Sequence, residues 1–298
     1  MPDTYSLPDG LIVWAPNRFE AQVLHREMFV ERSYFRHGIS LRDDAAVVDV
    51  GANIGMFGLY IARNFPRATI HMLEPVPSTF ELLEMNVGGL RGEIDLHLHN
   101  VGLAAEPGSV TFQVDPKLSF AASMRTDVVE GSRRDVRHEA EWAEAVLLDL
   151  PRTFPGSRLA QAAAAALKNG LTRRAALTLV SVLLKLDSRA KAGRVKEVEC
   201  RVMRLSDFLR EQVIKEVDLL KIDVEGAELE VIEGLPEADW PRIKQIVAEV
   251  HDIDGRAEQL RSMLRTRGYD VVTEPEEWAV HRLLGITTLF ARRASSVS

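Results

Sequence analysis

The chain has 298 residues, of which 46% are hydrophobic and 27% charged, as is ordinary for a soluble globular protein of one large domain or two small ones. Its formal net charge of −7 argues against a broad electrostatic grip on nucleic acid or on an anionic membrane surface. The single cysteine, Cys200, excludes an internal disulfide and favours a reducing compartment, so we expect a cytoplasmic protein.

Residues 1–45 are expected to form an N-terminal extension. A short strand is predicted at residues 11–14, and a helix is predicted from about residue 18 to residue 30. The start of the chain has neither the basic nor the apolar region of a signal peptide, in keeping with a cytoplasmic location. Tyr34 to His37 follow just ahead of the core, where they either close over a cofactor or pack the extension on the core.

Residues 47–55 read V-V-D-V-G-A-N-I-G and are the most informative segment of the chain. The valines predict a buried parallel strand, and Gly51 and Gly55 let the backbone approach a ligand at the start of the following helix. The next predicted strand, residues 69–73, ends at Glu74, where a carboxylate can accept hydrogen bonds from both hydroxyls of a ribose. This combination predicts a nucleoside-binding site.

The glycine pattern decides between two nucleoside cofactors. A dinucleotide site requires G-x-G-x-x-G, but Asn53 and Met56 stand where the second and third glycines would follow Gly51. S-adenosylmethionine (SAM) has no pyrophosphate and does not need the complete glycine set, and Asp49 suits the ammonium of its methionine moiety better than it suits phosphates. The sequence therefore favours SAM over a nicotinamide cofactor, and Glu74 disfavours a purely structural turn.

The first half of the core, residues 46–116, continues with alternating helices and strands. A helix is predicted over residues 79–87, and a strand over residues 95–99 precedes Asn100. Strands and helices that alternate at this spacing predict a parallel, doubly wound α/β sheet. Residues 110–114 are expected to form a hairpin-type addition.

Residues 117–195 interrupt this rhythm and contain no run that resembles a strand. Helices are predicted at residues 135–148, 157–168 and 171–187, which makes the region a helical insertion between two core strands. Its apolar residues are interrupted too often to cross a bilayer. Long insertions usually have a function, so we consider a lid over the acceptor, a homodimer surface and a docking patch for a carrier protein, besides a subdomain without contact to the site.

The core resumes over residues 196–298 with strands separated by helices. The predicted strands are residues 196–203, 217–222, 245–250, 271–273 and 285–291. The second of them runs into Asp223-Val224-Glu225-Gly226, and the third ends at His251. The last two are expected to form a terminal pair of strands.

Polar side chains follow most of the predicted core strands. In an open parallel sheet the ligand lies outside the carboxyl ends of the strands, so these side chains should lie along the ligand-binding edge. They are Asp49, Glu74, Asn100, Asp223, Glu225, Glu249 and His251. A single carboxylate at such a position is often only a helix N-cap, as Asp223 or Glu225 could be, but so many polar strand ends favour a functional site.

Methyl transfer from a sulfonium to an oxygen requires an acceptor held close to the methyl carbon and a group that removes the acceptor proton. His251 is the best-placed base by residue type, although a structural histidine is an equally good interpretation. Asp223 is the second choice, or it orients the acceptor. These two residues, with Glu225 and Glu249, could also hold a divalent cation, but they lack a compact spacing signature, so no metal site is predicted.

The chain resembles the FkbM family of SAM-dependent methyltransferases in the segments at its predicted strand ends, which are residues 48–55, 74–75, 100–103, 220–228 and 249–251. The most specific part of the resemblance is K-I-D-V-E-G-A-E at residues 221–228. The resemblance covers roughly residues 45–115 and 195–291. It implies a class I methyltransferase (Rossmann-like) sheet, mostly parallel with a terminal antiparallel strand, and transfer to an oxygen acceptor. The helical insertion departs from the compact pattern, so the acceptor cannot be carried over.

The predicted SAM site comprises Asp49, Gly51, Asn53, Gly55, Glu74, Asn100 and Asp223, and the predicted catalytic residues are His251, Asp223 and Glu225. We expect a cytoplasmic O-methyltransferase that acts on a hydroxyl of a small-molecule, glycoside or carrier-bound natural-product intermediate. The alternatives are a carboxylate or nitrogen acceptor and a non-catalytic SAM-fold interaction protein. The acidic charge, and the lack of an N-P-P-[YF] run after the fourth strand, argue against methylation of a base or of RNA.

Overall fold

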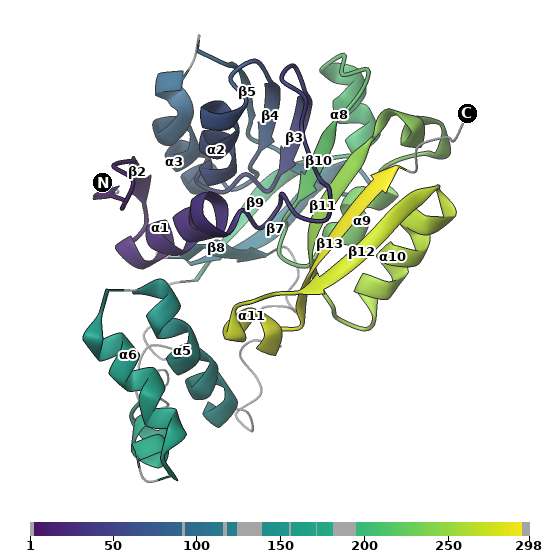
Figure 1. Cartoon of the computed structure of the whole chain (residues 1–298). Helices are drawn as coiled ribbons and strands as arrows, with labels where there is room; N and C mark the ends of the chain where they lie inside the picture. The colour runs from purple at the N-terminus through teal and green to yellow at the C-terminus, as the bar shows by residue number, and fades with distance from the viewer. Residues whose placement is uncertain are drawn as a thin grey trace.

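The computed structural model describes residues 3–90, 93–115, 118–123, 139–154, 156–170, 172–180 and 195–293. They form a seven-stranded central sheet flanked by helices, a second sheet of four strands, an N-terminal hairpin and a group of helices that projects from the core (Figure 1). No helix among these residues is long and apolar enough to span a membrane.

The central sheet has the strand order β12-β13-β11-β10-β3-β4-β5. In chain order its strands are β3(Ala46–Val50), β4(Thr69–Leu73), β5(Asp95–His99), β10(Leu219–Ile222), β11(Gln245–His251), β12(Tyr269–Pro275) and β13(Ile286–Arg293). Strand β13 runs antiparallel to both of its neighbours, and the remaining neighbouring pairs are parallel. This sheet confirms the predicted class I methyltransferase fold.

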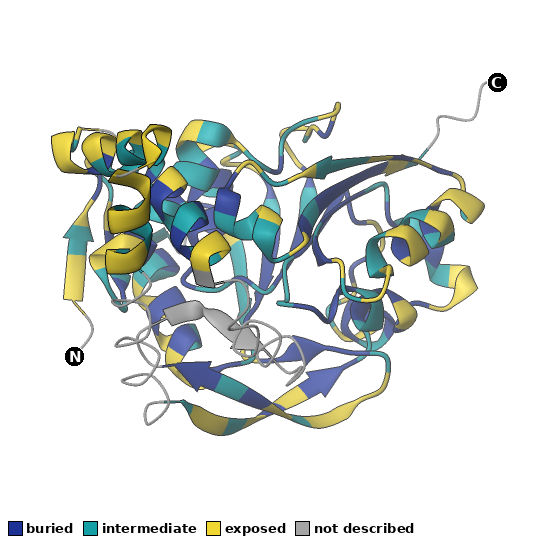
Figure 2. Cartoon of the chain, turned by 90° about the horizontal axis from the view of Figure 1, so that it is seen from below, coloured by how far each residue is buried: buried dark blue, intermediate teal, exposed yellow. Residues whose placement is uncertain are grey.

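Apolar residues alternate along the central strands and build one hydrophobic core on each face of the sheet. Val47 packs into one core and Val48 into the other, and both are fully buried. The helices of the first core are α2(Met56–Asn64) and α3(Pro77–Val87), with the short turn η2(Gly88–Leu90). Those of the second are α8(Leu205–Glu211), α9(Glu228–Glu233) and α10(Arg256–Thr266), with the short turn η5(Glu237–Arg242). The strands between the two layers are buried over most of their length (Figure 2).

The second sheet has the strand order β6-β9-β7-β8. Its strands are β6(Gly102–Leu103), β7(Gly108–Asp115), β8(Leu118–Ser123) and β9(Lys196–Met203). Two expectations were wrong here, because β9 does not join the central sheet and β8 lies in the region that was expected to hold no strand. The apolar pattern of β9 marks a half-buried strand without identifying its partner, and Cys200 packs with Phe112 in a small core of its own.

The N-terminal extension begins with a hairpin of β1(Asp3–Ser6) and β2(Ile12–Ala15). The Asn17 side chain caps α1(Arg18–His25) by accepting a hydrogen bond from the Glu20 amide at 2.9 Å. The helix then continues as a π-helical segment, η1(Arg26–Glu31). The predicted helix is therefore present, but its second half is wound more widely, a form that is rare and concentrated at functional sites.

The insertion contains α5(Glu139–Thr153), α6(Arg158–Ala165) and the short turn η4(Ala166–Lys168), and residues 172–180 are also helical. Its helical character is confirmed over these residues, while predicted helical positions 135–138 and 181–187 lie outside the described ranges. The boundaries of the insertion and of the N-terminal extension stay a prediction. Helix α5 packs against α6 and against α11(Ala279–Leu283), a short helix between β12 and β13 (Figure 1).

Candidate active site

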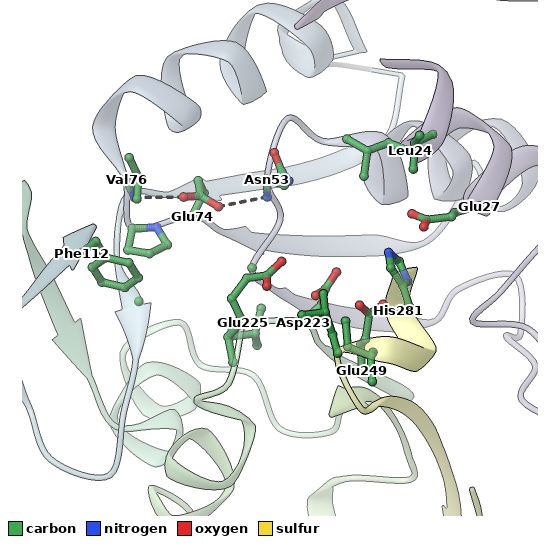
Figure 3. Close-up of a pocket in the computed structure, with 18 of the residues that line it drawn as sticks. Leu24, Glu27, Asn53, Glu74, Val76, Phe112, Asp223, Glu225, Glu249 and His281 are labelled. Carbon is green, nitrogen blue, oxygen red and sulfur yellow. Dashed lines mark hydrogen bonds between the residues drawn. The ribbon is translucent and has the colours of Figure 1, made fainter. Parts of the chain in front are cut away.

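An open cavity of about 1120 Å³ lies at the carboxyl edge of the central sheet (Figure 3). It is lined by the segments that follow β3, β4 and β10, by α1, η1 and α11, and by the second sheet. The predicted site residues that line it are Gly51, Asn53, Glu74, Asp223 and Glu225. The other predicted site residues, Asp49, Gly55, Asn100 and His251, do not line it.

The Glu74 carboxylate is fixed by two backbone amides. Its Oε2 accepts a hydrogen bond from the Asn53 N–H and its Oε1 accepts one from the Val76 N–H, each at 3.0 Å (Figure 3). Burial raises the pKa of the carboxyl to about 7, although the amide hydrogen bonds oppose the rise. Each oxygen keeps the capacity for a second hydrogen bond, as two ribose hydroxyls would require. Val76 and Phe112 line the cavity beside it and offer the apolar surface that suits an adenine ring.

The turn after β3 requires glycine at residue 51. Gly51 has a φ of +76°, and a Cβ atom there would lie 1.8 Å from the carbonyl oxygen of Asp223. The chain segments that follow β3 and β10 therefore meet backbone against backbone. Gly55 serves packing instead, since a Cβ atom there would lie 2.7 Å from Leu83 Cδ1 on α3.

Asp49 lies beneath this turn and pairs with a buried lysine. Lys221 Nζ is 3.0 Å from Asp49 Oδ1 and 3.4 Å from Asp223 Oδ2, and it donates a hydrogen bond to the Gly51 carbonyl at 2.8 Å. Burial lowers the pKa of Lys221, but the two aspartates raise it by more than burial lowers it. The net pKa lies above the ordinary value, so the side chain is an ammonium. Asp49 was expected to face the cavity, but it does not line it. It supports the turn through Lys221 instead. The one sequence signal for the Lys221–Asp49 pair is the lysine within the apolar run L-L-K-I, because a buried lysine needs a carboxylate partner.

Asn100 holds the backbone beside Glu74. Its Nδ2 donates hydrogen bonds to the carbonyl oxygens of Glu74 at 2.8 Å and of Pro75 at 3.1 Å. Because Glu74 carries the expected ribose contact, Asn100 acts on the site through the position of this segment. Its amide does not line the cavity.

Tyr34 connects the N-terminal extension to the site. Its hydroxyl donates a hydrogen bond to Asp223 Oδ2 at 3.0 Å, and its ring packs edge-on against Phe57. The next residue, Phe35, stacks on Phe57 and packs the extension on the core. This segment therefore packs the extension on the core, as one of the two expected roles required, and closure over a cofactor stays a prediction.

His251 lies between two glutamates behind the lining. Its Nε2 is 3.2 Å from Glu225 Oε2 and its Nδ1 is 3.4 Å from Glu228 Oε1. Burial would lower the pKa of His251, but the two carboxylates raise it to about 11, so the ring is an imidazolium at neutral pH. An imidazolium has no free lone pair, and the geometry does not support the base role expected for His251. It instead holds Glu225, which faces the cavity.

Two titratable residues of the cavity were not predicted from the sequence, Glu27 on η1 and His281 on α11 (Figure 3). Burial lowers the pKa of His281 to about 4, so its imidazole is neutral at physiological pH. Its Nδ1 atom is buried and has no hydrogen-bond partner within the described chain. Neither residue belongs to a strand end or to a motif, so the sequence carried no signal for them.

Helix α5 of the insertion caps the helix that carries His281. Asp149 Oδ1 accepts a hydrogen bond from the Ala279 N–H at 2.8 Å, and Oδ2 accepts one from the Val280 N–H at 2.9 Å. These are the first amides of α11, which have no partner inside the helix. The insertion is therefore joined directly to the wall of the cavity, contrary to the alternative of a subdomain without contact to the site.

Arg152 adds a second attachment of α5. Its Nε lies 2.7 Å from Glu31 Oε1, its Nη2 pairs with Glu277, and its guanidinium stands 4.9 Å from the centre of the Trp278 ring. One side chain of the insertion therefore bridges η1 and the segment just before α11.

The metal site considered for Asp223, Glu225, Glu249 and His251 has no support in this geometry. His251 faces Glu225 and Glu228 behind the lining. In the part of the chain that the structure describes, no group of three or more histidine, cysteine, aspartate and glutamate side chains is arranged to hold a metal ion. A site without metal stays a prediction.

Comparison with known proteins identifies relatives that match most of the chain. The profile of the "Methyltransferase FkbM domain" matches residues 166–271. The "AMB antimetabolite synthetase AmbE" of Pseudomonas aeruginosa is 34% identical over 271 residues, which are 89% of this chain and 11% of that protein. The solved structure of "Methyltransferase FkbM from Methylobacillus flagellatus KT" aligns with 87% of this chain and 46% of its own, at 13% identity and a TM-score of 0.47.

The family of the chain is shown by a relative of matching length. The "31-O-demethyl-FK506 methyltransferase FkbM" of Streptomyces tacrolimicus is 35% identical over 280 residues, which are 92% of this chain and 91% of that protein. The class I sheet and the glycine turn beside Glu74 agree with this relationship. The chain therefore belongs to the FkbM family and is a SAM-dependent methyltransferase.

Proposed function

We propose that this enzyme transfers a methyl group to a hydroxyl of a small-molecule, glycoside or carrier-bound natural-product intermediate. The observation that carries the proposal is a neutral imidazole, His281, at the end of the cavity opposite Glu74 (Figure 3). An alcohol must lose its proton when its oxygen is methylated, and a neutral imidazole can take that proton. The name of the relative from Streptomyces tacrolimicus, a 31-O-demethyl-FK506 methyltransferase, agrees with an oxygen acceptor.

The described residues fit SAM in the half of the cavity around Glu74. The Glu74 carboxylate would accept hydrogen bonds from the ribose hydroxyls, and Gly51, which also lines the cavity, lets the turn after β3 pack directly against the Asp223 backbone. Bound there, SAM supplies a methyl group that its sulfonium already activates. The acceptor oxygen forms the new C–O bond as the S–CH₃ bond breaks, and His281 receives the hydroxyl proton. Asp223, held by Tyr34 and Lys221, orients the acceptor.

A carboxylate acceptor fits this cavity poorly. Five carboxylates line it, and no lysine or arginine of the described chain does. An anionic acceptor would be repelled in a partly enclosed, low-dielectric site. A nitrogen acceptor has no such charge conflict and is distinguished by experiment.

The test is the position of the transferred methyl group. The enzyme is incubated with SAM labelled in its methyl group and with a panel of hydroxylated macrolides, glycosides and amino sugars, and the products are analysed by mass spectrometry and NMR. The proposal expects the label on an oxygen. A label found only on nitrogen or on a carboxyl group would refute it.

A further inference from the structure

More carboxyl groups line the cavity than the described residues around it pair. The carboxylates that line it are Glu27, Glu74, Asp223, Glu225 and Glu249. Three of them have protein partners. Glu74 accepts hydrogen bonds from two backbone amides, and Asp223 faces Lys221 and accepts a hydrogen bond from the Tyr34 hydroxyl. Glu225 faces the imidazolium of His251. The other two require a different explanation.

Glu27 and Glu249 have no hydrogen-bond or ion-pair partner among the described residues. They come from η1 and β11, and both lie with His281 at the end of the cavity away from Glu74 (Figure 3). Burial raises the pKa of each well above its ordinary value. Neighbouring carboxylates raise both values further, with Glu276 and Asp223 the strongest contributors. Two such buried groups at one end of a cavity are a costly arrangement unless a ligand uses them.

Two cationic side chains interact electrostatically with this pair, Arg152 with Glu27 and Lys221 with Glu249, but each is paired with another carboxylate. Arg152 pairs with Glu31 and Glu277, and Arg26 also pairs with Glu31. His281 is neutral and its buried Nδ1 is without a partner in the described chain, which is a second sign that this end of the cavity is completed by a ligand. SAM has a net charge of +1 and cannot by itself pair both Glu27 and Glu249.

We propose that Glu27 and Glu249 form a subsite for a protonated primary amine, so that the preferred acceptors are amino alcohols, including amino sugars. The inference rests on the proposed function, because it assigns this amine to the hydroxyl-bearing acceptor. An ammonium between the two carboxylates makes charge-assisted hydrogen bonds in a site with little competing water. The same carboxylates discriminate against anionic acceptors by repulsion.

The test is calorimetry on the full chain saturated with S-adenosylhomocysteine, which needs no turnover. The probes are trans-2-aminocyclohexanol and its neutral analogue trans-1,2-cyclohexanediol. We expect the wild type to bind the amino alcohol at least about tenfold more tightly than the diol, as charge-assisted hydrogen bonds imply. Glu27→Gln and Glu249→Gln should each reduce that preference severalfold with little change in diol affinity. Glu258→Gln, an exposed carboxylate of α10, is the matched control and should change neither value.

Three outcomes would overturn the proposal. Equal affinity of the wild type for the amino alcohol and the diol would do so without any variant, which keeps the test valid if a variant fails to fold. Retention of the full amine preference in both variants would do so as well. A loss of SAM affinity in the variants, with S-adenosylhomocysteine affinity and amine preference unchanged, would assign the carboxylates to the sulfonium. The proposed function fails separately, since it depends on where the labelled methyl group is found.

Discussion

Two histidines near the cavity are held in opposite protonation states by their surroundings. Burial would lower the pKa of His251, but Glu225 and Glu228 raise it to about 11. His281 has no such ion pair, and burial lowers its pKa to about 4. A general base needs a free lone pair at the working pH, so the neutral ring of His281 suits this role and the imidazolium of His251 does not. Residue type alone could not distinguish the two histidines.

Replacement of His281 by alanine tests this role. We expect His281→Ala to lower kcat by about a hundredfold, the usual contribution of a positioned base, while the Kd of S-adenosylhomocysteine stays unchanged. His97→Ala, which removes a partly exposed histidine of β5, is the control and should leave both values unaltered. Full activity of His281→Ala, together with an inactive Asp223→Asn, would transfer the base role to Asp223.

Glu74 predicts a pH dependence of SAM binding. The ionised carboxylate is the better acceptor for ribose hydroxyls, and burial raises its pKa to about 7. SAM affinity of the wild type should therefore fall as the pH is lowered from 8.5 to 5.5, as Glu74 becomes protonated. Glu74→Gln should bind SAM about tenfold more weakly at pH 8 and lose most of this pH dependence, measured by calorimetry. An unchanged pH profile in the variant would assign the titration to another group.

At the scale of elements, the site depends on the close approach of the segments that follow β3 and β10. Gly51 lies so close to the Asp223 carbonyl that no side chain fits between them. Lys221 lies directly below and hydrogen-bonds to the Gly51 carbonyl at 2.8 Å. This contact fixes the distance between the turn expected to hold SAM and the aspartate expected to orient the acceptor.

Alanine at this turn should be strongly destabilising. Gly51→Ala combines a φ of +76° with a Cβ atom 1.8 Å from a backbone oxygen, and we expect a loss of about 3 kcal/mol or more in the free energy of unfolding. Gly10→Ala is the matched control, because Gly10 has a φ of +84° with no atom within 4 Å, and should cost only about 1 kcal/mol. Urea unfolding measures both. Equal losses would show that the close contact relaxes at no cost.

The elements of the central sheet could be predicted because their strands are short apolar runs separated by helical patterns. The partners of half-buried strands could not, and β9, with an apolar pattern like that of a core strand, pairs with β7 in the second sheet. Periodicity gives the face that a strand buries, whereas pairing depends on contacts with residues far away in the chain.

On the scale of the whole molecule, the cavity combines a floor from the sheet with walls from distant chain segments. Glu74 and Gly51 follow strands and were predictable, because strand ends meet at one edge of a parallel sheet. Glu27 and His281 reach the cavity through η1 and through α11, which α5 holds in place. Their positions follow from tertiary packing, for which a single sequence contains no pattern.

The attachment of the insertion to α11 makes a prediction about activity. Asp149→Ala removes the acceptors of the Ala279 and Val280 amides, so α11 should fray and hold His281 less firmly. We expect kcat/KM to fall about tenfold, S-adenosylhomocysteine affinity to stay constant, and hydrogen exchange at these two amides to accelerate. Glu144→Ala, which removes a pair with Arg173 within the insertion, is the control. Unchanged exchange at both amides would contradict the capping role.

The ion pair between Lys221 and Asp49 also bears on how the sheet assembles. The two residues stand opposite each other in the pairing of β10 with β3. A shift of one residue in either direction would place the lysine opposite Val48 or Val50, with a buried ammonium and a buried carboxylate both unpaired. Apolar neighbours alone would tolerate such a shift, because valine precedes and follows Asp49. The charge pair therefore penalises misaligned strands during folding, in addition to supporting the turn in the finished protein.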